Sequence, residues 1–498
     1  MKLLTMIENL GINPINQTKQ SLDTVVTGLA LDSRMVEKGF LFAALEGDKL
    51  DGRDYIPAAL NAGATSILLQ TDSNIDDTVL SQAIVLEHGN PRKALAEMAA
   101  RLYAPQPKYC VAITGTNGKT SVANFVKQIW SGLDINAASI GTLGVVSDKV
   151  NKSGGLTTPD TVAFHSTLQE LGNVGVSHVV FEASSHGLNQ HRMDGVEVAV
   201  AGFTNLSHEH LDYHGTMESY FEAKSRLFVE LLVQNGVAVI NTDNEWGNKL
   251  AHLCEANRKK IITIGDDEDN TIRLDECLEQ PQGYKCCVTY EGQEYAFDLN
   301  LLGRFQVDNA LMAAGMVLAE GLDAKKVFSA LEHLNGVDGR MELAGLSPTG
   351  ARVLIDYAHT PDGLENALAS LQSHRVDGKL LIVFGCGGNR DQDKRPIMGK
   401  IAEQFADVVF VTDDNPRDED PAQIRAEVLQ GTPSASEFDD RAKAINHAIS
   451  QLEKDDVLLI TGKGHEQGQI VGDKVLPFSD LSTVRAAIES LVKVGVKS

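Results

Sequence analysis

The chain has 498 residues, of which 43% are hydrophobic and 22% charged, and this composition is typical of a soluble globular protein with about three domains. Its formal net charge of -24 argues against sequence-independent binding to nucleic acid, because such binding needs Lys and Arg to neutralise phosphates. The 6 cysteines show no Cys-x-x-Cys spacing, so we expect reduced thiols and neither a zinc site nor a redox motif.

The sequence also predicts no targeting or membrane segment. The first apolar run is interrupted early by Glu8 and Asn9, so it lacks the core of a signal peptide. No stretch approaches the roughly 20 apolar residues that a membrane span requires. We therefore expect a protein that works in the cytoplasm without membrane insertion.

Residues 1–90 predict a small N-terminal α/β domain. Short apolar runs at 39–45 and 65–70 alternate there with turn-forming Gly, Asp and Asn. An amphipathic helix is predicted at about 91–103, because Pro91 favours the start of a helix. The segment APQP that follows is typical of a short, rigid linker.

Two series of strand-like apolar runs follow, each alternating with helical periodicity, and this alternation predicts βαβ units around mostly parallel sheets. We therefore predict an α/β protein of three domains: the N-terminal domain, a central phosphate-loop domain at 91–336 and a Rossmann-like C-terminal domain at 337–498. The first series lies at 109–114, 178–184, 198–206, 237–243 and 260–265, and the second at 352–357, 379–385, 407–413 and 456–462.

Polar motifs follow these apolar strands at the positions where open α/β sheets place their ligand crevices. We therefore expect the motifs to meet in one site. They are GTNGKT at 115–120, EASSH at 182–186, DYAHTP at 356–361, GCGGNRD at 385–391, DDNPRD at 413–418 and GKGHE at 462–466.

The segment GTNGKT lies between a predicted strand and a helix, which is the context of a phosphate loop. Its glycines let backbone N–H groups approach phosphate, Lys119 meets the terminal phosphates and Thr120 can ligate Mg²⁺. The two glycines are closer together than in the common pattern, so the alternative is a tight turn with a surface lysine. We infer binding of ATP or GTP by Gly115, Thr116, Asn117, Gly118, Lys119, Thr120 and Ser121.

This shorter loop is the form used by the Mur ligase family and the related folylpolyglutamate synthases, and the chain resembles the Mur ligases over essentially its whole length. The resemblance implies an N-terminal domain for a UDP sugar, a central ATPase domain and a C-terminal domain that brings the amino acid. It is also carried by LDSR at 31–34, TTPD at 157–160, FTNLSHEHLDYHG at 203–215, FEAKSRLF at 221–228, GRME at 339–342 and DNPR at 414–417.

The resemblance implies an ATP-dependent amide ligase of peptidoglycan synthesis. The D-glutamate γ-carboxylate of UDP-MurNAc-L-Ala-D-Glu would take the γ-phosphoryl group of ATP, and meso-diaminopimelate would attack the acyl phosphate to give amide, ADP and phosphate. Magnesium suits such phosphoryl transfer, and we expect a monomer. The alternatives are a lysine-adding ligase of the same family, a folylpolyglutamate synthase-like ligase, and a nucleotide-gated regulatory protein that hydrolyses ATP slowly.

The resemblance also implies the catalytic centre. Lys119, Lys224 and Arg340 match catalytic positions, and Lys224 would carry a carbamate. Each role has a simpler alternative: Glu182 as a helix cap, His208 or His214 in place of His210, Lys224 as a solvated lysine and Arg340 in a surface ion pair. The implied metal ligands are Thr120, Glu182, His210 and carbamylated Lys224, and the further nucleotide contacts are Asn309, Arg340, Asp356 and His359.

The amino-acid site follows from substrate chemistry. Diaminopimelate carries a carboxylate that lysine lacks, and the fork of Arg417 can hold it with Arg390 as a second cation. Asp414 and Glu466 could accept from the ammonium, and Asn415, Pro416 and Gly462 would complete the pocket. Lysine-adding ligases lack this arginine, although Asp-Asn-Pro is also ordinary turn chemistry. The resemblance assigns the muramoyl dipeptide to Leu31, Ser33, Thr157, Thr158, Ser184, Gln190 and Arg192.

Overall fold

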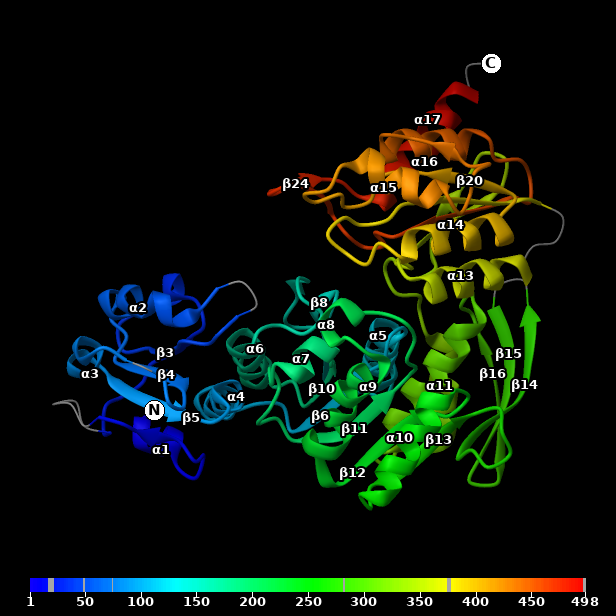
Figure 1. Cartoon of the computed structure of the whole chain (residues 1–498). Helices are drawn as coiled ribbons and strands as arrows, with labels where there is room; N and C mark the ends of the chain where they lie inside the picture. The colour runs from blue at the N-terminus through cyan, green and yellow to red at the C-terminus, as the bar shows by residue number, and fades with distance from the viewer. Residues whose placement is uncertain (17–21, 48–49, 74, 281–282, 374–377, 496–498) are drawn as a thin grey trace.

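The computed structural model describes residues 1–16, 22–47, 50–73, 75–280, 283–373 and 378–495. Three main sheets follow one another along the chain, with helices packed on their faces. Figure 1 shows the N-terminal part in blue on one side of the central green part, and the yellow-to-red C-terminal part above it. Among the described residues, none of the helices combines the length and the apolar content that crossing a bilayer requires.

The N-terminal sheet has five strands in the order β1-β5-β4-β3-β2, and only the β1–β5 pair is antiparallel. Ala94, Leu95 and Met98 of the predicted helix pack into the core of this sheet. The boundary near residue 90 stays a prediction. The elements are α1 (Leu3–Ile7), β1 (Asn13–Pro14), β2 (Leu29–Ala30), η1 (Ser33–Met35), β3 (Leu41–Ala43), η2 (Gly52–Tyr55), α2 (Ile56–Ala62), β4 (Ser66–Gln70), α3 (Asp77–Gln82), β5 (Ile84–His88) and α4 (Pro91–Leu102).

The central sheet has eleven strands in the order β16-β15-β14-β13-β12-β11-β6-β10-β7-β8-β9. Strands β14, β13, β12, β11, β6, β10 and β7 form a parallel centre, and antiparallel strands extend both edges. The strands are β6 (Tyr109–Thr114), β7 (Ala137–Gly141), β8 (Gly144–Ser147), β9 (Lys152–Ser153), β10 (His178–Glu182), β11 (Val198–Phe203), β12 (Leu232–Asn241), β13 (Lys260–Gly265), β14 (Ile272–Gln280), β15 (Gly283–Tyr290) and β16 (Gln293–Leu299).

Helices cover both faces of the central sheet, because successive side chains of a strand point to opposite faces. On β6, Val111 and Ile113 pack in one core with α5 and α11, while Cys110 and Ala112 pack in the other with α6 and α10. The helices are α5 (Lys119–Gly132), α6 (Thr161–Asn173), α7 (Ser185–Asn189), α8 (Leu211–His214), α9 (Met217–Arg226), η3 (Leu227–Leu231), α10 (Glu245–Ala256), α11 (Arg304–Leu318), α12 (Ala324–Ala330) and η4 (Leu331–His333).

The C-terminal sheet has six strands in the order β17-β18-β22-β19-β20-β21, and only β17 is antiparallel to its neighbour. A separate hairpin of β23 and β24 projects from this part of the molecule (Figure 1). The elements are β17 (Glu342–Leu346), β18 (Arg352–Asp356), α13 (Pro361–Ser373), β19 (Leu380–Phe384), α14 (Lys394–Phe405), β20 (Val408–Val411), α15 (Pro421–Leu429), β21 (Ser436–Glu437), α16 (Arg441–Ser450), β22 (Val457–Thr461), β23 (Gly468–Val471), β24 (Lys474–Pro477) and α17 (Asp480–Gly495).

A buried ion pair ties the last helix to the C-terminal sheet. Arg441 of α16 and Asp480 of α17 are 2% and 0% exposed. Two guanidinium nitrogens of Arg441 donate to the Asp480 carboxylate at 2.8 and 2.7 Å, and Nη2 also donates to the carbonyl of Thr461 at 2.7 Å. Thr461 ends β22, so this pair supports the strand from which the motif GKGHE emerges.

Candidate active site

The loop 115–120 joins the end of β6 to the start of α5, as the sequence predicted. Gly115 and Gly118 have φ values of +148° and +86°. A Cβ at Gly115 would lie 1.9 Å from the Thr204 hydroxyl, and one at Gly118 would lie 2.4 Å from Oδ1 of Asn309. Both positions therefore require glycine, and Asn309 lies against the phosphate loop.

Lys119 lies folded over this loop. Its Nζ donates to the carbonyls of Gly115 and Thr116 at 2.9 and 2.8 Å. Burial lowers the pKa of Lys119, whereas the carboxylates of Glu209 and Glu182 act in the opposite direction. The loop thus combines a cation with the free N–H groups at the start of a long helix, which is the arrangement that phosphate binding uses.

Glu182 ends β10 beside the phosphate loop and is only 2% exposed. Its Oε2 accepts from the hydroxyls of Thr120 at 3.0 Å and Thr142 at 3.2 Å, and its Oε1 accepts from the Thr142 backbone at 2.8 Å. The next helix, α7, is capped by Ser184 instead, whose side chain accepts from the Gly187 backbone. Glu182 is therefore a buried acid aimed at the loop and not a helix cap.

Lys224 is not a solvated lysine. It is 1% exposed in α9, its Nζ donates to the carbonyl of Gly115 at 2.7 Å, and it lies 4.6 Å from the centre of the Tyr220 ring. Burial, reinforced by the charge of Lys119, holds the pKa of Lys224 well below its ordinary value. Carbamylation needs the neutral amine, and a lowered pKa favours that form.

His210 begins the short helix α8 with a left-handed φ of +56°. Its ring lies 4.9 Å from that of His186, and burial lowers the pKa of His210 to about 4, so the imidazole is neutral near pH 7. His214 instead stacks on Tyr220 with ring centres 5.1 Å apart. A neutral imidazole can donate a lone pair to a metal, and the choice of His210 as ligand stays a prediction.

The C-terminal part contributes Arg340 to the same place. Its Nη2 donates to the Thr120 hydroxyl at 3.2 Å, and its guanidinium lies 4.3 Å from the centre of the Tyr357 ring. Asp356 accepts from the Met341 backbone at 2.7 Å and fixes the segment beside Arg340. Arg340 therefore reaches the phosphate loop from a separate sheet.

Glu209 is a residue that the sequence did not single out. Its Oε1 meets Nε2 of His359 at 3.1 Å, which joins the central and C-terminal parts. Burial acts to raise the pKa of Glu209, but the hydrogen bond to His359 and nearby positive charge, including that of Lys119, outweigh it, so the pKa lies below its ordinary value. Its position between two histidines in the motif 203–215 was the feature that could have identified Glu209. In the sequence alone, such an acid resembles a solvated residue.

Five of the residues predicted to contact the UDP-muramoyl dipeptide, all in the central part, belong to one hydrogen-bonded network. The Thr158 hydroxyl donates to the Glu182 carbonyl at 2.7 Å and lies 3.0 Å from the Ser184 hydroxyl. Arg192 donates to the Thr158 carbonyl at 2.6 Å and to Oε1 of Gln190 at 2.9 Å. Thr157 belongs to this network because its hydroxyl accepts from the Thr142 hydroxyl at 3.1 Å. Leu31 and Ser33 lie in the N-terminal part, at the end of β2 and in η1.

The predicted amino-acid loop follows β20, and Arg417 holds a left-handed φ of +53°. Its Nη1 donates to the carbonyls of Gly388 at 2.9 Å and Asn415 at 3.3 Å. A Cβ at Gly387 would lie 2.8 Å from Nη1 of Arg417 and 3.9 Å from Cγ of Arg390, so the two arginines flank one glycine. Burial and the charge of Arg390 lower the pKa of Arg417.

The two acids predicted for the amino-acid site, Asp414 and Glu466, differ in their exposure to solvent. Asp414 is 5% exposed, burial raises its pKa, and a Cβ at Gly462 would lie 2.5 Å from its Oδ2. Glu466 keeps 31% of its side chain exposed and accepts from Nδ2 of Asn415 at 2.9 Å. Glu466 is thus the better placed of the two to meet a substrate ammonium, while Pro416 is buried beside them.

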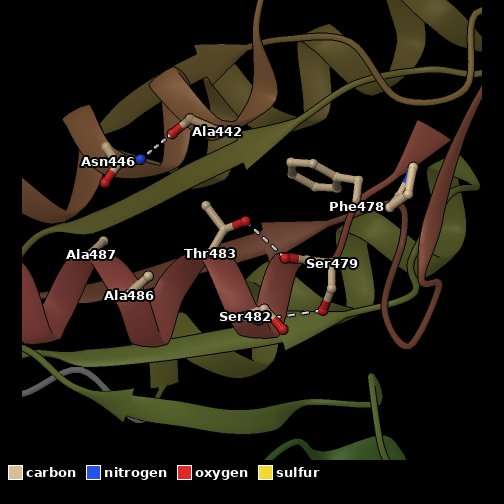
Figure 2. A pocket seen from close by; sticks show the side chains of 9 residues that line it. Ala442, Asn446, Phe478, Ser479, Ser482, Thr483, Ala486 and Ala487 are labelled. Carbon is tan, nitrogen blue, oxygen red and sulfur yellow. Dashed lines mark hydrogen bonds between the residues drawn. The ribbon is translucent and has the colours of Figure 1, made fainter.

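A shallow groove lies elsewhere in the C-terminal part, between α16 and α17 (Figure 2). It has a volume of about 460 Å³, and Figure 2 shows mostly small and hydroxylated side chains along it. The predicted site residues do not line it, so we assign the groove no role in the chemistry. Its lining is Ala442, Asn446, Pro477, Phe478, Ser479, Ser482, Thr483, Ala486 and Ala487.

Comparison with known families gives matches along most of the chain. The model described as "Mur ligase family, catalytic domain" matches residues 25–103, "Mur ligase middle domain" matches 113–317, and "Mur ligase, glutamate ligase domain" matches 339–464. These three matches follow the order of the three sheets.

Curated relatives and a solved structure agree. A protein of Zymomonas mobilis subsp. mobilis named UDP-N-acetylmuramoyl-L-alanyl-D-glutamate--2,6-diaminopimelate ligase is 48% identical over 98% of this chain and 99% of its own length. One of the same name from Bradyrhizobium diazoefficiens is 48% identical over 94% and 96%. A solved structure of a ligase with this name has a TM-score of 0.70 at 31% identity and covers 99% of both chains. The chain belongs to the Mur ligase family.

Proposed function

We propose that this member of the family is an ATP-dependent ligase that joins meso-diaminopimelate to the D-glutamate γ-carboxylate of UDP-MurNAc-L-Ala-D-Glu in peptidoglycan synthesis. The observation that carries the proposal is the pairing of Arg417 with Arg390 around Gly387, in a chain whose 48%-identical relatives are named for diaminopimelate. Two cations beside an accepting carboxylate suit an amino acid with a second carboxylate and ammonium. We propose that the enzyme works as a monomer in the cytoplasm.

The residues divide the chemistry among them. The loop 115–121, Lys119 and Asn309 bind the nucleotide, and Arg340 opposes the negative charge that develops during phosphoryl transfer. Thr157, Thr158, Ser184, Gln190 and Arg192, with Leu31 and Ser33 on the uridine side, hold the acceptor so that its carboxylate faces the γ-phosphate. Positioning of this kind is the larger part of catalysis in phosphoryl transfer.

The donor set beside the loop fits Mg²⁺. Thr120 and Glu182 offer oxygen atoms, which Mg²⁺ prefers, and in the described part of the chain no three His, Cys, Asp or Glu side chains are placed to hold a metal ion by themselves. An ion that completes its shell with substrate phosphates and water needs no such cluster. When bound, Mg²⁺ would offset phosphate charge, with His210 and a carbamate on Lys224 as further ligands.

Amino-acid selection rests on the loop 414–417 and on Glu466. Diaminopimelate brings a carboxylate to Arg417 and Arg390, whereas L-lysine leaves these cations without an anionic partner. An unpaired, half-buried cation costs enough free energy for discrimination of about a hundredfold or more. The amine to be joined attacks the acyl phosphate as the neutral base, and Glu466 with Asn415 holds the other ammonium.

The test is release of phosphate from ATP by the purified protein with UDP-MurNAc-L-Ala-D-Glu, comparing meso-diaminopimelate with L-lysine. We expect release with diaminopimelate and little with lysine, and Arg417→Ala should abolish this preference. Arg352→Ala, which alters an arginine of β18 in the same sheet, is the control and should keep it.

Other outcomes separate the alternatives. Release with lysine would support a lysine-adding ligase and overturn the role of Arg417. Release with a folate and glutamate would indicate a folylpolyglutamate synthase-like enzyme. Slow ATP hydrolysis at a rate that depends on neither the UDP-linked dipeptide nor the amino acid would indicate a nucleotide-gated regulatory protein.

A further inference from the structure

Lys463 is a fully buried lysine inside the motif GKGHE, and none of the roles above uses it. It is 0% exposed and lies in the loop that follows β22. Its Nζ donates to Oδ1 of Asn415 at 3.0 Å and to Oε2 of Glu466 at 3.0 Å. A buried ammonium is costly unless it is paired and hydrogen-bonded, so its position between two predicted pocket residues needs an explanation.

The three side chains form a closed triangle. Asn415 donates through Nδ2 to the same Oε2 of Glu466 at 2.9 Å, and its Oδ1 also accepts from the backbone of Ile470 at 2.9 Å. The amide of Asn415 therefore has one orientation, with its oxygen toward two donors and its nitrogen toward a carboxylate. Lys463 fixes that orientation and balances the charge of Glu466.

Strand β23, whose residue Ile470 donates to Asn415, also forms hydrogen bonds with Arg417. The Arg417 backbone donates to the Ile470 carbonyl at 3.1 Å, and its carbonyl accepts from Gly472 at 2.7 Å. Gln469 donates through its side chain to the Asp414 carbonyl at 2.7 Å. Hairpin strand β23 thus supports the loop 414–417 along its length, and a displaced Asn415 changes the support of Arg417.

We propose that Lys463 is a positioning residue of the diaminopimelate pocket, which sets Asn415 and Glu466 for the substrate ammonium and, through β23, Arg417 for its distal carboxylate. This inference rests on the proposed function. Lys463 does not contact the reacting atoms: it acts through the triangle. Its removal should therefore weaken binding of the amino acid and leave the nucleotide and UDP-dipeptide sites unchanged.

The test is steady-state kinetics of Lys463→Met with each substrate varied in turn. We expect the KM for diaminopimelate to rise about tenfold or more, because Glu466 loses its balancing charge and Oδ1 of Asn415 loses one of its two donors. The KM values for ATP and UDP-MurNAc-L-Ala-D-Glu should stay within about twofold. The preference for diaminopimelate over L-lysine should fall, since lysine makes no use of Arg417.

Two further variants keep the test decisive. Lys454→Met changes a lysine with 83% of its side chain exposed and should match the wild type. Gln469→Ala removes only the contact to the Asp414 carbonyl from a half-exposed position, and should give a smaller change of the same kind. If Lys463→Met does not fold, Gln469→Ala decides the matter, and an unchanged KM for diaminopimelate in that variant overturns the proposal.

The outcomes also distinguish this inference from the proposed function. A wild-type protein without diaminopimelate-dependent phosphate release would refute the proposed function itself. An active wild type together with an unchanged diaminopimelate KM and selectivity in Lys463→Met would refute only the role of Lys463. An equal rise in the KM of all three substrates would show a general structural role and would also overturn the positioning proposal.

Discussion

The hydroxyl of Thr120 donates to Oε2 of Glu182 at 3.0 Å, which joins the end of the phosphate loop to the end of the neighbouring strand. Glu182→Gln keeps the shape and removes the charge that would face Mg²⁺. We expect phosphate release to fall about a hundredfold or more, with a higher Mg²⁺ concentration needed for half-maximal rate. Glu255→Gln, at an exposed position of α10, should behave as wild type, and an unchanged Mg²⁺ dependence in Glu182→Gln would contradict the ligand role.

Variants of Lys224 can test whether its role depends on the ammonium charge of the lysine or on a carbamate formed on it. Lys224→Ala should lose nearly all activity and regain part of it with added short carboxylates, because a small anion can take the place of the carbamate. Lys260→Ala, at an exposed position of β13, should be fully active and insensitive to these anions. Full activity of Lys224→Ala without any addition would rule out the carbamate.

Gly462 should tolerate no side chain. Its φ is +108°, and a Cβ there would lie 2.5 Å from Oδ2 of Asp414. Left-handed strain of about 1–2 kcal/mol, together with displacement of Asp414, should raise the KM for diaminopimelate at least about tenfold in Gly462→Ala. Gly350→Ala has φ +91° and nothing within 4 Å, so it should show only a small loss of stability. Equal KM values in the two variants would show that the contact with Asp414 is unimportant.

His165 should make the central part of the protein sensitive to acid. Its side chain is 0% exposed, and burial lowers its pKa from 6.5 to about 4. Between these values the unfolded chain binds a proton that the folded chain does not, so stability should be constant above pH 6.5 and fall as the pH drops toward 4. The loss from this group should reach up to about 3 kcal/mol.

The measurement is urea unfolding followed by tryptophan fluorescence at several pH values. Both tryptophans, Trp130 and Trp246, lie in the central part that contains His165. His165→Asn should make the dependence on pH between 4 and 6.5 less steep, whereas His252→Asn, with 81% of the side chain exposed in the wild type, should not. If the free energy of unfolding falls with pH equally in the wild type and in His165→Asn, His165 is not the cause of the acid sensitivity.

The strands that carry the site could be predicted from the sequence, because fully buried strands are continuous apolar runs. The run at 109–114 is β6, and the run at 456–462 contains β22. The motifs at strand ends were predicted to meet, and some of them are in contact: Thr120 donates to Glu182, and Arg417 donates to the Gly388 carbonyl. That all of them form one site stays a prediction. The carboxyl ends of parallel strands lie at the same edge of a sheet, so the position of a motif directly after such a strand is enough to place the motif at that edge.

Other features depend on partners distant in sequence. The antiparallel strands β14, β15 and β16 expose one face, and charged residues interrupt their apolar pattern. Glu209 and Lys463 look like solvated residues until His359 and Asn415 are placed beside them. The burial of Lys224 likewise follows from the packing of α9 and not from its neighbours. The roles of these side chains in binding and catalysis stay predictions.

The ion pair between Arg441 and Asp480 has a consequence for protein synthesis. Strand β6, the phosphate loop and Asn309 all lie within residues 109–309, which leave the ribosome well before α17. Strand β22 pairs with β18 and β19, but at its end the Thr461 carbonyl accepts from Arg441, a buried cation whose charge is balanced only when Asp480 of the last helix is present. Since domains generally fold in the order of their synthesis, a nascent chain is expected to form its phosphate loop early, whereas Arg340 and the amino-acid loop are added only with the C-terminal sheet.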